Sequence, residues 1–190
     1  MTKELHSIRS ICVYCGSSPG TDPAMVAAAS RLGTLLAEHH LRLVYGGGDR
    51  GLMGAVAKAV LAGRGAVLGV IPEFLLQKEQ SGGSDELAGA TISVVDDMHT
   101  RKHQMFEAAD AFIALPGGIG TLEELVEMMT WAQLARHEKP IGLLNTNQFW
   151  SPFVSLVEHM STLGFIHNPE RTVLKIAAEP EELLRQILGR

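Results

Sequence analysis

Hydrophobic positions along the chain follow two spacings. Short apolar runs, typical of buried strands, alternate with longer stretches in which apolar residues recur every three or four positions, as in amphipathic helices. The pattern predicts strands over residues 8–15, 41–45, 66–71, 91–95, 111–115, 141–144 and 173–176. It predicts helices over residues 23–40, 51–62, 98–109, 121–136, 149–163 and 180–188.

Strands that alternate with helices predict an α/β fold of the Rossmann-like, doubly wound type, with a mostly parallel sheet and helices on both faces. The chain shows no internal repeat or linker, so residues 1–190 are expected to form a single domain. The polar, glycine-rich stretch 77–89 is expected to be a mobile loop. Two helices carry start signals: Asp96 or Asp97 as an N-cap, and Pro180 in a first turn.

The composition is that of a globular protein, because 46% of the 190 residues are hydrophobic and 19% are charged. The formal net charge of −5 argues against nucleic acid or an anionic membrane surface as the main partner. Any anion must therefore be bound by a local site. Neither a signal peptide nor an apolar run near the roughly 18 residues of a membrane helix is visible, which predicts a cytoplasmic protein.

Three predicted strands end in glycine-rich turns, and these are Cys15-Gly16-Ser17-Ser18, Tyr45-Gly46-Gly47-Gly48 and Leu115-Pro116-Gly117-Gly118. In a parallel sheet all three lie at the carboxyl edge, where doubly wound folds bind ligands. Ser17 and Gly47 are therefore candidate ligand contacts. The second turn also matches the G-x-G-x-x-G dinucleotide fingerprint formally, but it follows the second strand instead of the first, so NAD is not expected.

The third turn leads through the sequence Pro-Gly-Gly-Ile-Gly-Thr directly into a helix. Glycines let backbone amides approach an anion closely, Thr121 adds a hydroxyl group, and the helix N-terminus adds a favourable dipole. The turn is predicted to bind a phosphate group. The alternative is a tight turn in which Thr121 only caps the helix.

Helical spacing then selects charged side chains near this edge. Arg101 shares an apolar stripe with Met98 and Met105, so it must be paired or face a ligand. A salt bridge to a core carboxylate is the alternative for Arg101. Lys102 borders the same face of the helix.

The helix after the third turn is predicted to bury one face, which is formed by Leu122, Leu125, Val126, Met129 and Ala132. Glu123 and Glu127 point away from this face, toward solvent or a partner subunit. Glu124 flanks it near Thr121. Glu124 therefore either faces the pocket over the phosphate turn or acts as a capping residue three positions after Thr121.

Two further patterns could indicate redox or metal chemistry. Cys12 and Cys15 form a C-x-x-C, but within a strand they lie about 10 Å apart, which favours core packing over a disulfide. His99 and His103 are spaced for chelation, but two cations lie between them and no third ligand is apparent. We expect neither a redox centre nor a metal.

The sequence resembles the cytokinin-activating phosphoribohydrolases of the Lonely Guy family. Residues 116–124 match the family signature P-G-G-x-G-T-x-x-E, and residues 98–102 match its M-x-x-R-K element. The resemblance covers nearly the whole chain. It implies hydrolysis of the N-glycosidic bond of an adenine-type nucleoside 5′-monophosphate, giving the free base and ribose 5-phosphate without a cofactor. It also implies a homodimer with active sites close to the subunit interface.

Carried over by position, the resemblance assigns Arg101 and Glu124 as the catalytic pair. It assigns the phosphate to Gly117, Gly118, Gly120 and Thr121. It places Lys102, Glu123 and Thr130 along the site, with Glu86 as a candidate ligand contact in the preceding loop. A carboxylate such as Glu124 can stabilise oxocarbenium-like charge at C1′ and activate water. Arg101 would either pair with the phosphate or hold Glu124 ionised, and no second carboxylate stands out to protonate the leaving base.

Two competing functions remain. Similar proteins are often labelled lysine decarboxylases, but that chemistry needs pyridoxal phosphate on a Schiff-base lysine, and none of Lys58, Lys78, Lys102 and Lys139 has a suitable setting. A non-catalytic nucleotide-binding or molybdenum-cofactor carrier protein would share the fold. Such a protein would need the phosphate turn but not the pair of Arg101 and Glu124, so the hydrolase is favoured.

Overall fold

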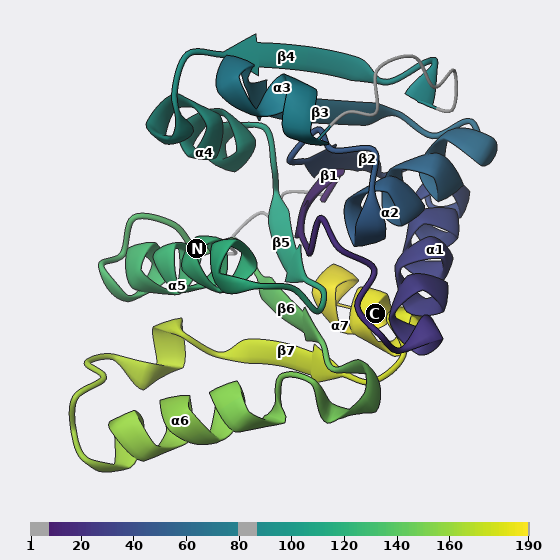
Figure 1. Cartoon of the computed structure of the whole chain (residues 1–190). Coiled ribbons are helices and arrows are strands. Elements are labelled where there is room, and N and C mark those ends of the chain that lie inside the picture. The colour runs from purple at the N-terminus through teal and green to yellow at the C-terminus, as the bar shows by residue number, and fades with distance from the viewer. Residues whose placement is uncertain (1–7, 80–86, 190) are drawn as a thin grey trace, which may run out of the picture.

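The computed structural model describes residues 8–79 and 87–189, in which seven strands form one sheet in the order β4-β3-β2-β1-β5-β6-β7 (Figure 1). All six neighbouring pairs are parallel. The strands are β1 Ser10–Tyr14, β2 Arg42–Tyr45, β3 Val67–Pro72, β4 Thr91–Val95, β5 Ala111–Ala114, β6 Ile141–Leu144 and β7 Leu174–Ala177. Every strand predicted from the sequence is therefore present, with small differences at the ends.

Helices cover both faces of the sheet, which confirms the predicted doubly wound α/β architecture (Figure 1). The helices are α1 Pro23–Glu38, α2 Gly51–Ala62, α3 Glu73–Glu79, α4 Met98–Glu107, α5 Ile119–Gln133, α6 Ser151–Thr162 and α7 Pro180–Leu188. Helices α1, α2 and α7 pack on one face, and α4, α5 and α6 pack on the other. In the described parts of the chain, no helix is both long and apolar enough to cross a membrane.

The core consists of two layers separated by the sheet. Because side chains alternate along a strand, Ile11 and Val13 of β1 join the layer under α1 and α2, whereas Cys12 joins the layer under α4 and α5. Cys15, three positions after Cys12, belongs to the first layer. Both cysteines are buried and are not joined in a disulfide, so the prediction that they pack in the core is confirmed.

Backbone geometry explains where two helices differ from prediction. Helix α1 ends before His40, which adopts the left-handed conformation with φ of 55°. Helix α5 begins at Ile119, two residues earlier than predicted, with Gly118 as its N-cap. Thr121 therefore lies inside the first turn of α5. The alternative prediction, that Thr121 caps the helix, is wrong. The left-handed Ala135, with φ of 57°, lies just beyond the end of α5.

Helix α3 was not predicted, because seven residues are too few to show a helical repeat. It starts where β3 ends at Pro72, with Glu73 in its first turn, where a negative charge is favourable. The expected loop 77–89 is therefore helical at its beginning, while residues 80–86 lie outside the described residues. The N-cap of α4 is Asp97, whose carboxylate accepts a hydrogen bond from Thr100 N at 2.7 Å, as predicted.

The sheet order reverses between β1 and β5, and this reversal creates a crevice at their carboxyl ends. The two strands are adjacent, with Tyr14 in register with Ala114. Beyond them, Gly16 N donates a hydrogen bond to the carbonyl oxygen of Pro116 at 3.1 Å, which joins the first and third glycine-rich turns. Ligands of open α/β sheets bind at such a switch point.

Candidate functional site

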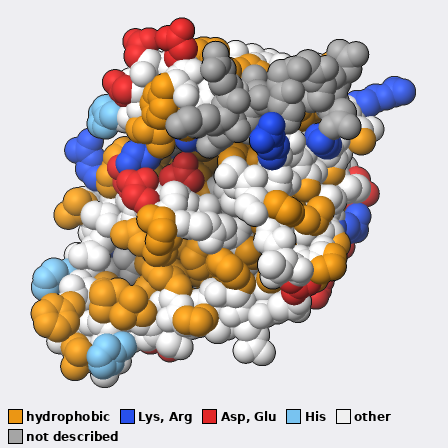
Figure 2. Space-filling model, in the orientation of Figure 1, with side chains coloured by type: hydrophobic (Ala, Val, Ile, Leu, Met, Phe, Trp, Pro, Cys, Tyr) orange, Lys and Arg blue, Asp and Glu red, His pale blue; other side chains and the backbone are white. Residues whose placement is uncertain are grey.

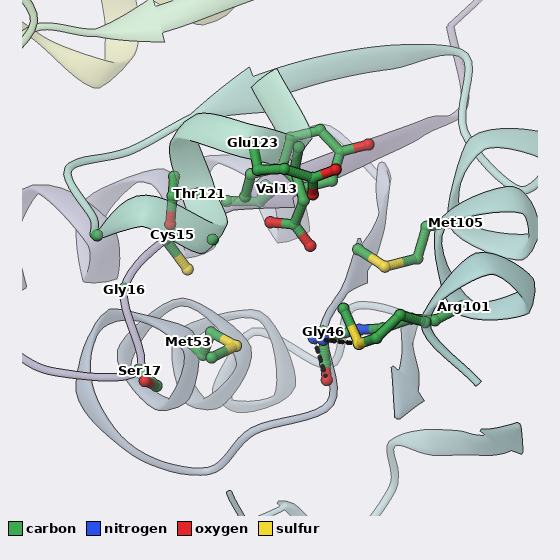
Figure 3. Close-up of a pocket in the computed structure, with 15 residues that line it drawn as sticks. Val13, Cys15, Gly16, Ser17, Gly46, Met53, Arg101, Met105, Thr121 and Glu123 are labelled. Carbon is green, nitrogen blue, oxygen red and sulfur yellow. Dashed lines mark hydrogen bonds between the residues drawn. The ribbon is translucent and has the colours of Figure 1, made fainter. Parts of the chain in front are cut away.

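A cavity of about 180 Å³ lies at this switch point (Figure 3). It is lined by Val13, Tyr14, Cys15, Gly16, Ser17, Gly46, Met53, Met98, Arg101, Met105, Gly118, Gly120, Thr121, Glu123 and Glu124. Residues from the first, second and third glycine-rich turns thus meet in one place, as the sequence predicted.

The third turn forms one end of the cavity. Thr121 is buried and lines it together with Gly118 and Gly120. A Cβ atom at Gly117 would overlap the Thr121 hydroxyl group and lie 2.9 Å from Gly16 N, so only glycine fits there. The first N–H groups of a helix have no partner within the helix, so this end of α5 favours an anion in the cavity.

The first and second turns contribute differently from each other. Ser17 lines the cavity and is exposed, as expected of a ligand contact. In the second turn the cavity is lined by Gly46, whereas Gly47 lies against β3, where a Cβ atom would approach Ile71 Cβ to 2.9 Å. Gly47 also has φ of 81°, which favours glycine. Gly47 therefore shapes the turn, and its neighbour Gly46 reaches the site.

Arg101 is only 6% exposed, and its guanidinium group is fixed by backbone carbonyl groups. Its Nε donates to the carbonyl oxygen of Val70 at 3.2 Å, and its Nη2 donates to that of Gly46 at 3.0 Å. These carbonyls belong to β3 and to the turn after β2. Figure 3 shows Arg101 on the opposite side of the cavity from Thr121, at the end remote from the third glycine-rich turn.

Glu124 is half-buried and lines the cavity one helical turn after Thr121. Burial raises the pKa values of the Cys12 thiol and the Tyr14 hydroxyl in β1. The negative charge of Glu124 raises both pKa values further. Both groups therefore stay protonated at neutral pH. The alternative that Glu124 caps the helix is wrong, because the N-cap is Gly118, six positions earlier.

Lys102 connects α4 to α5 at the rim of the cavity. Its Nζ lies 2.6 Å from Glu123 Oε1 and 3.1 Å from Glu127 Oε1. Burial lowers the pKa of Lys102, but the hydrogen bonds to the two glutamates outweigh this effect, so its net pKa is raised. Glu123 is exposed, as predicted, and lines the cavity, but Glu127 is half-buried because Lys102 holds it against α4. Lys102 does not itself line the cavity.

Thr130 lies outside the cavity, on the exposed side of α5, where its hydroxyl donates to the carbonyl oxygen of Val126 at 2.8 Å. Val126 itself is 42% exposed, so its predicted place in the core is wrong. Leu134, one turn after Thr130, is 64% exposed. Glu86 lies outside the described residues.

Several residues that line the cavity were not predicted to do so. Met53, Met98 and Met105 surround the Arg101 end, and Met98 and Met105 had been assigned only to an apolar stripe. Flexible thioether side chains adapt well to a flat apolar ligand. Periodicity cannot distinguish a core methionine from one that faces a cavity, so the stripe alone carried no signal for this role.

Comparison with known proteins places the chain in a family. A sequence-family profile described as "Possible lysine decarboxylase" matches residues 53–187. The chain is 48% identical to a cytokinin riboside 5′-monophosphate phosphoribohydrolase of Arabidopsis thaliana, over 93% of this chain and 80% of that protein. It is likewise 48% identical to an enzyme of the same name from Oryza sativa subsp. japonica, over 94% of this chain and 72% of that protein.

Solved structures share the fold at lower sequence identity. The molybdenum cofactor binding protein of Rippkaea orientalis superposes with a TM-score of 0.68 at 22% identity, covering 95% of both chains. The Moco carrier protein of Chlamydomonas reinhardtii superposes with a TM-score of 0.68 at 21% identity, over 95% of this chain and 97% of that chain. At this identity the likeness establishes the architecture alone.

Proposed function

Since this chain belongs to the family of the cytokinin riboside 5′-monophosphate phosphoribohydrolases, we propose that it hydrolyses the N-glycosidic bond of an adenine-type nucleoside 5′-monophosphate. The products are the free base and ribose 5-phosphate. The observation that carries the proposal is the placement of Thr121, in the glycine-rich start of α5, and Glu124, a carboxylate, one helical turn apart in the same cavity.

The 5′-phosphate is bound at the N-terminus of α5, by the backbone of Gly118 and Gly120, the Thr121 hydroxyl and Ser17. Gly117 contributes by letting the turn approach Gly16 closely. Binding the phosphate fixes the ribose over the next turn of the helix, which brings C1′ toward Glu124. The interaction energy of a non-reacting group thereby positions the reacting centre.

Glu124 then acts on the sugar. Cleavage of the bond between C1′ and the base nitrogen leaves positive charge on the sugar, which the carboxylate stabilises in a cavity partly shielded from water. Glu124 also takes a proton from the attacking water, whose oxygen forms the new bond to C1′. The base leaves with the bonding electron pair and takes up a proton from solvent.

Arg101 acts at the base. If the phosphate lies beside Thr121, Arg101 is at the far end of the cavity and near the purine, with Met98 and Met105 packing on the ring. A guanidinium group held by the carbonyls of Gly46 and Val70 has its charge fixed before the reaction. It stabilises the electron pair that the base acquires as the bond breaks, which compensates for the lack of an obvious second carboxylate.

The test is product release from AMP and from N6-isopentenyl-AMP, measured side by side by chromatography with a coupled assay for ribose 5-phosphate. Equimolar free base and ribose 5-phosphate are expected, and the ratio of the two rates identifies the preferred base. Tight nucleotide binding without cleavage of either substrate would contradict the proposal and support a carrier protein.

The alternative of lysine decarboxylation does not fit the side chains present. Pyridoxal phosphate chemistry needs a lysine amine in the cavity, and among the described residues the cavity lining contains none. Lys102 is bound by two glutamates. Lys139 donates to the carbonyl oxygen of Phe106 at 2.7 Å and lies 3.8 Å above the ring of the same residue.

We also propose that two copies associate through the exposed side of α5. Val126, Thr130 and Leu134 recur every four residues there, and α6 has no buried residue. Figure 2 shows hydrophobic side chains gathered over and between α5 and α6. In such a dimer Thr130 would lie at the interface and contact the cavity of the partner subunit. Sedimentation should give the mass of a dimer, and Leu134→Asp should give a monomer.

Since nucleoside monophosphates are cytoplasmic metabolites, we place the enzyme in the cytoplasm.

A further inference from the structure

A second cavity, of about 360 Å³, lies beside the first on the other side of the phosphate-binding turn. It is lined by Gly16, Ser17, Ser18, Pro19, Gly20, Thr21, Asp22, Met25, Leu52, Pro116, Gly117, Gly118 and Phe149. The two cavities share Gly16, Ser17 and Gly118. The hydrolysis of a nucleoside monophosphate makes no use of this second space.

The shared residues Gly16, Ser17 and Gly118 form a ridge between the two cavities, in which Ser17 has the one hydroxyl side chain. Gly16 N donates to the carbonyl oxygen of Pro116 at 3.1 Å, and Gly117 packs so closely on Gly16 that a Cβ atom would lie 2.9 Å from Gly16 N. Of the three shared residues, only the exposed Ser17 has a side chain, because the other two are glycines. A ligand bound on the ridge can therefore extend into both spaces.

The walls of the second cavity suit a flat apolar group. Met25, Leu52 and Pro19 line it, and the ring of Phe149 is 40% exposed. Phe149 is held by an edge-to-face contact with Trp150, with 5.1 Å between the ring centroids. Aromatic and heterocyclic groups bind to such rigid apolar surfaces.

Charge narrows the class of ligand further. Among the described residues that line the second cavity, Asp22 carries a charge and no lysine or arginine is present. Asp22 accepts hydrogen bonds from Ala24 N at 2.9 Å and Asn147 Nδ2 at 2.7 Å, and these lower its pKa, so it is ionised at neutral pH. A second phosphate would meet a carboxylate with no compensating cation. The occupant is therefore uncharged.

We propose that the second cavity binds an uncharged aromatic or heterocyclic group esterified to the 5′-phosphate, so that the whole crevice accepts a nucleoside phosphodiester. The inference rests on the proposed function for the position of the phosphate on the ridge beside Gly118. A monoester fills the first cavity only. A diester directs its second ester group over Ser17 into the space bounded by Phe149, much as doubly wound folds bind a ligand across the switch point.

The test compares two ligands of equal charge, adenosine 5′-(methyl phosphate) and adenosine 5′-(phenyl phosphate), by calorimetric titration in competition with AMP. Burial of the phenyl ring should make the phenyl ester bind about tenfold more tightly than the methyl ester. Phe149→Ala, which removes a wall, and Thr21→Trp, which fills the space, should each abolish the difference. Phe165→Ala removes an exposed ring outside both cavities and should preserve it.

Equal affinities of the two esters, or phenyl-ester binding that does not displace AMP, would overturn the proposal. So would a phenyl-ester advantage that survives both cavity variants. The same variants should cleave AMP at the unaltered rate, because neither residue lines the first cavity. If AMP is never cleaved but the phenyl ester keeps its variant-sensitive advantage, the proposed function fails and the second binding site stands.

Discussion

The Nη2 atom of Arg101 lies 3.0 Å from the carbonyl oxygen of Gly46, and a Cβ atom at position 46 would overlap that same nitrogen. The turn after β2 therefore has to present bare backbone so that the guanidinium group can reach its place in the cavity wall. This contact ties the second glycine-rich turn to the M-x-x-R-K helix.

The first prediction concerns this contact. Gly46→Ala should lower kcat for AMP by at least about 10²-fold, because it displaces the Arg101 charge, which we propose stabilises the leaving base. If the loss arises through Arg101, the double variant with Arg101→Ala should be no slower than Arg101→Ala alone. Thermal unfolding of the variants serves as the control for folding. A double variant with multiplied losses would show that Gly46 acts independently.

The second prediction separates two adjacent acids. Glu124→Gln should reduce turnover about 10²–10³-fold while AMP still binds, since one electrostatic stabiliser is removed from the transition state. Glu123→Gln, at the exposed neighbouring position, should retain most of the activity. Steady-state kinetics and equilibrium binding of AMP measure both effects. Comparable losses of turnover in the two variants would contradict the role of Glu124 as the stabilising carboxylate.

A third prediction tests the proposed phosphate binding at the start of α5. Thr121→Val keeps the side-chain shape but removes the hydroxyl group, and a hydrogen bond to a charged group is worth about 1.5–3 kcal/mol. The value of kcat/KM for AMP should fall about 10–100-fold. The slow cleavage of adenosine, which lacks the phosphate, should not change. An equal loss with both substrates would assign Thr121 a structural role.

The fourth prediction concerns the ion pairs between α4 and α5. Lys102 and Glu127 have side chains that are 17% and 23% exposed, so breaking the pair leaves a poorly hydrated carboxylate. Lys102→Met should lower the free energy of unfolding by about 1–2 kcal/mol in urea titrations, and a second change, Glu127→Gln, should restore part of it. Arg31→Met breaks a more exposed pair with Glu181 and should cost less than about 1 kcal/mol.

The fifth prediction concerns acid stability. Asp110 Oδ2 accepts hydrogen bonds from Arg9 N at 2.9 Å and from Ser10 N at 3.0 Å. Partial burial raises the pKa of Asp110, but these bonds and that from the Ser10 hydroxyl lower it more, so its pKa in the folded state is below the ordinary value. The stabilisation is therefore complete above the unfolded pKa of about 3.9 and is lost as the pH falls through the folded value.

Asp110→Asn measures this contribution. The variant should be less stable at pH 7 by about 1–2 kcal/mol, and its unfolding free energy should depend less on pH below about pH 4 than that of the parent. Guanidinium titrations at several pH values provide the comparison. Parallel pH profiles for the two proteins would mean that Asp110 does not contribute to acid sensitivity.

The sequence predicted most of the fold because its strands are short apolar runs bounded by glycine, proline or acidic residues, and such signals are local. It missed α3, whose seven residues show no repeat. It placed Val126 in the core because helical spacing identifies an apolar side but not whether another element covers it. Both errors concern tertiary packing, which a periodic pattern does not contain.

The candidate site could be anticipated in part. The three glycine-rich turns were predicted to converge, since parallel strands bring their carboxyl ends to one edge. The family resemblance, and not the sheet, placed Arg101 and Glu124 together at that edge. Gly47 was predicted to line the cavity, but Gly46 does. This difference could not be foreseen, because it depends on the positive φ of Gly47 and on the contact that Arg101 makes from another helix. The setting of Glu127 likewise depends on Lys102, which lies 25 positions earlier in the chain.

The pairing of β1 with β5 brings together residues about 100 positions apart, such as Ile11 and Ala111. The cavity lies between the end of β1 and the turn that follows β5. Closing so long a loop is entropically costly and slow compared with helix formation. In refolding, nucleotide binding should therefore recover only when these two strands join, after most of the helical signal has returned. The same central position that brings the three glycine-rich turns together should make the candidate site one of the last parts of the molecule to form.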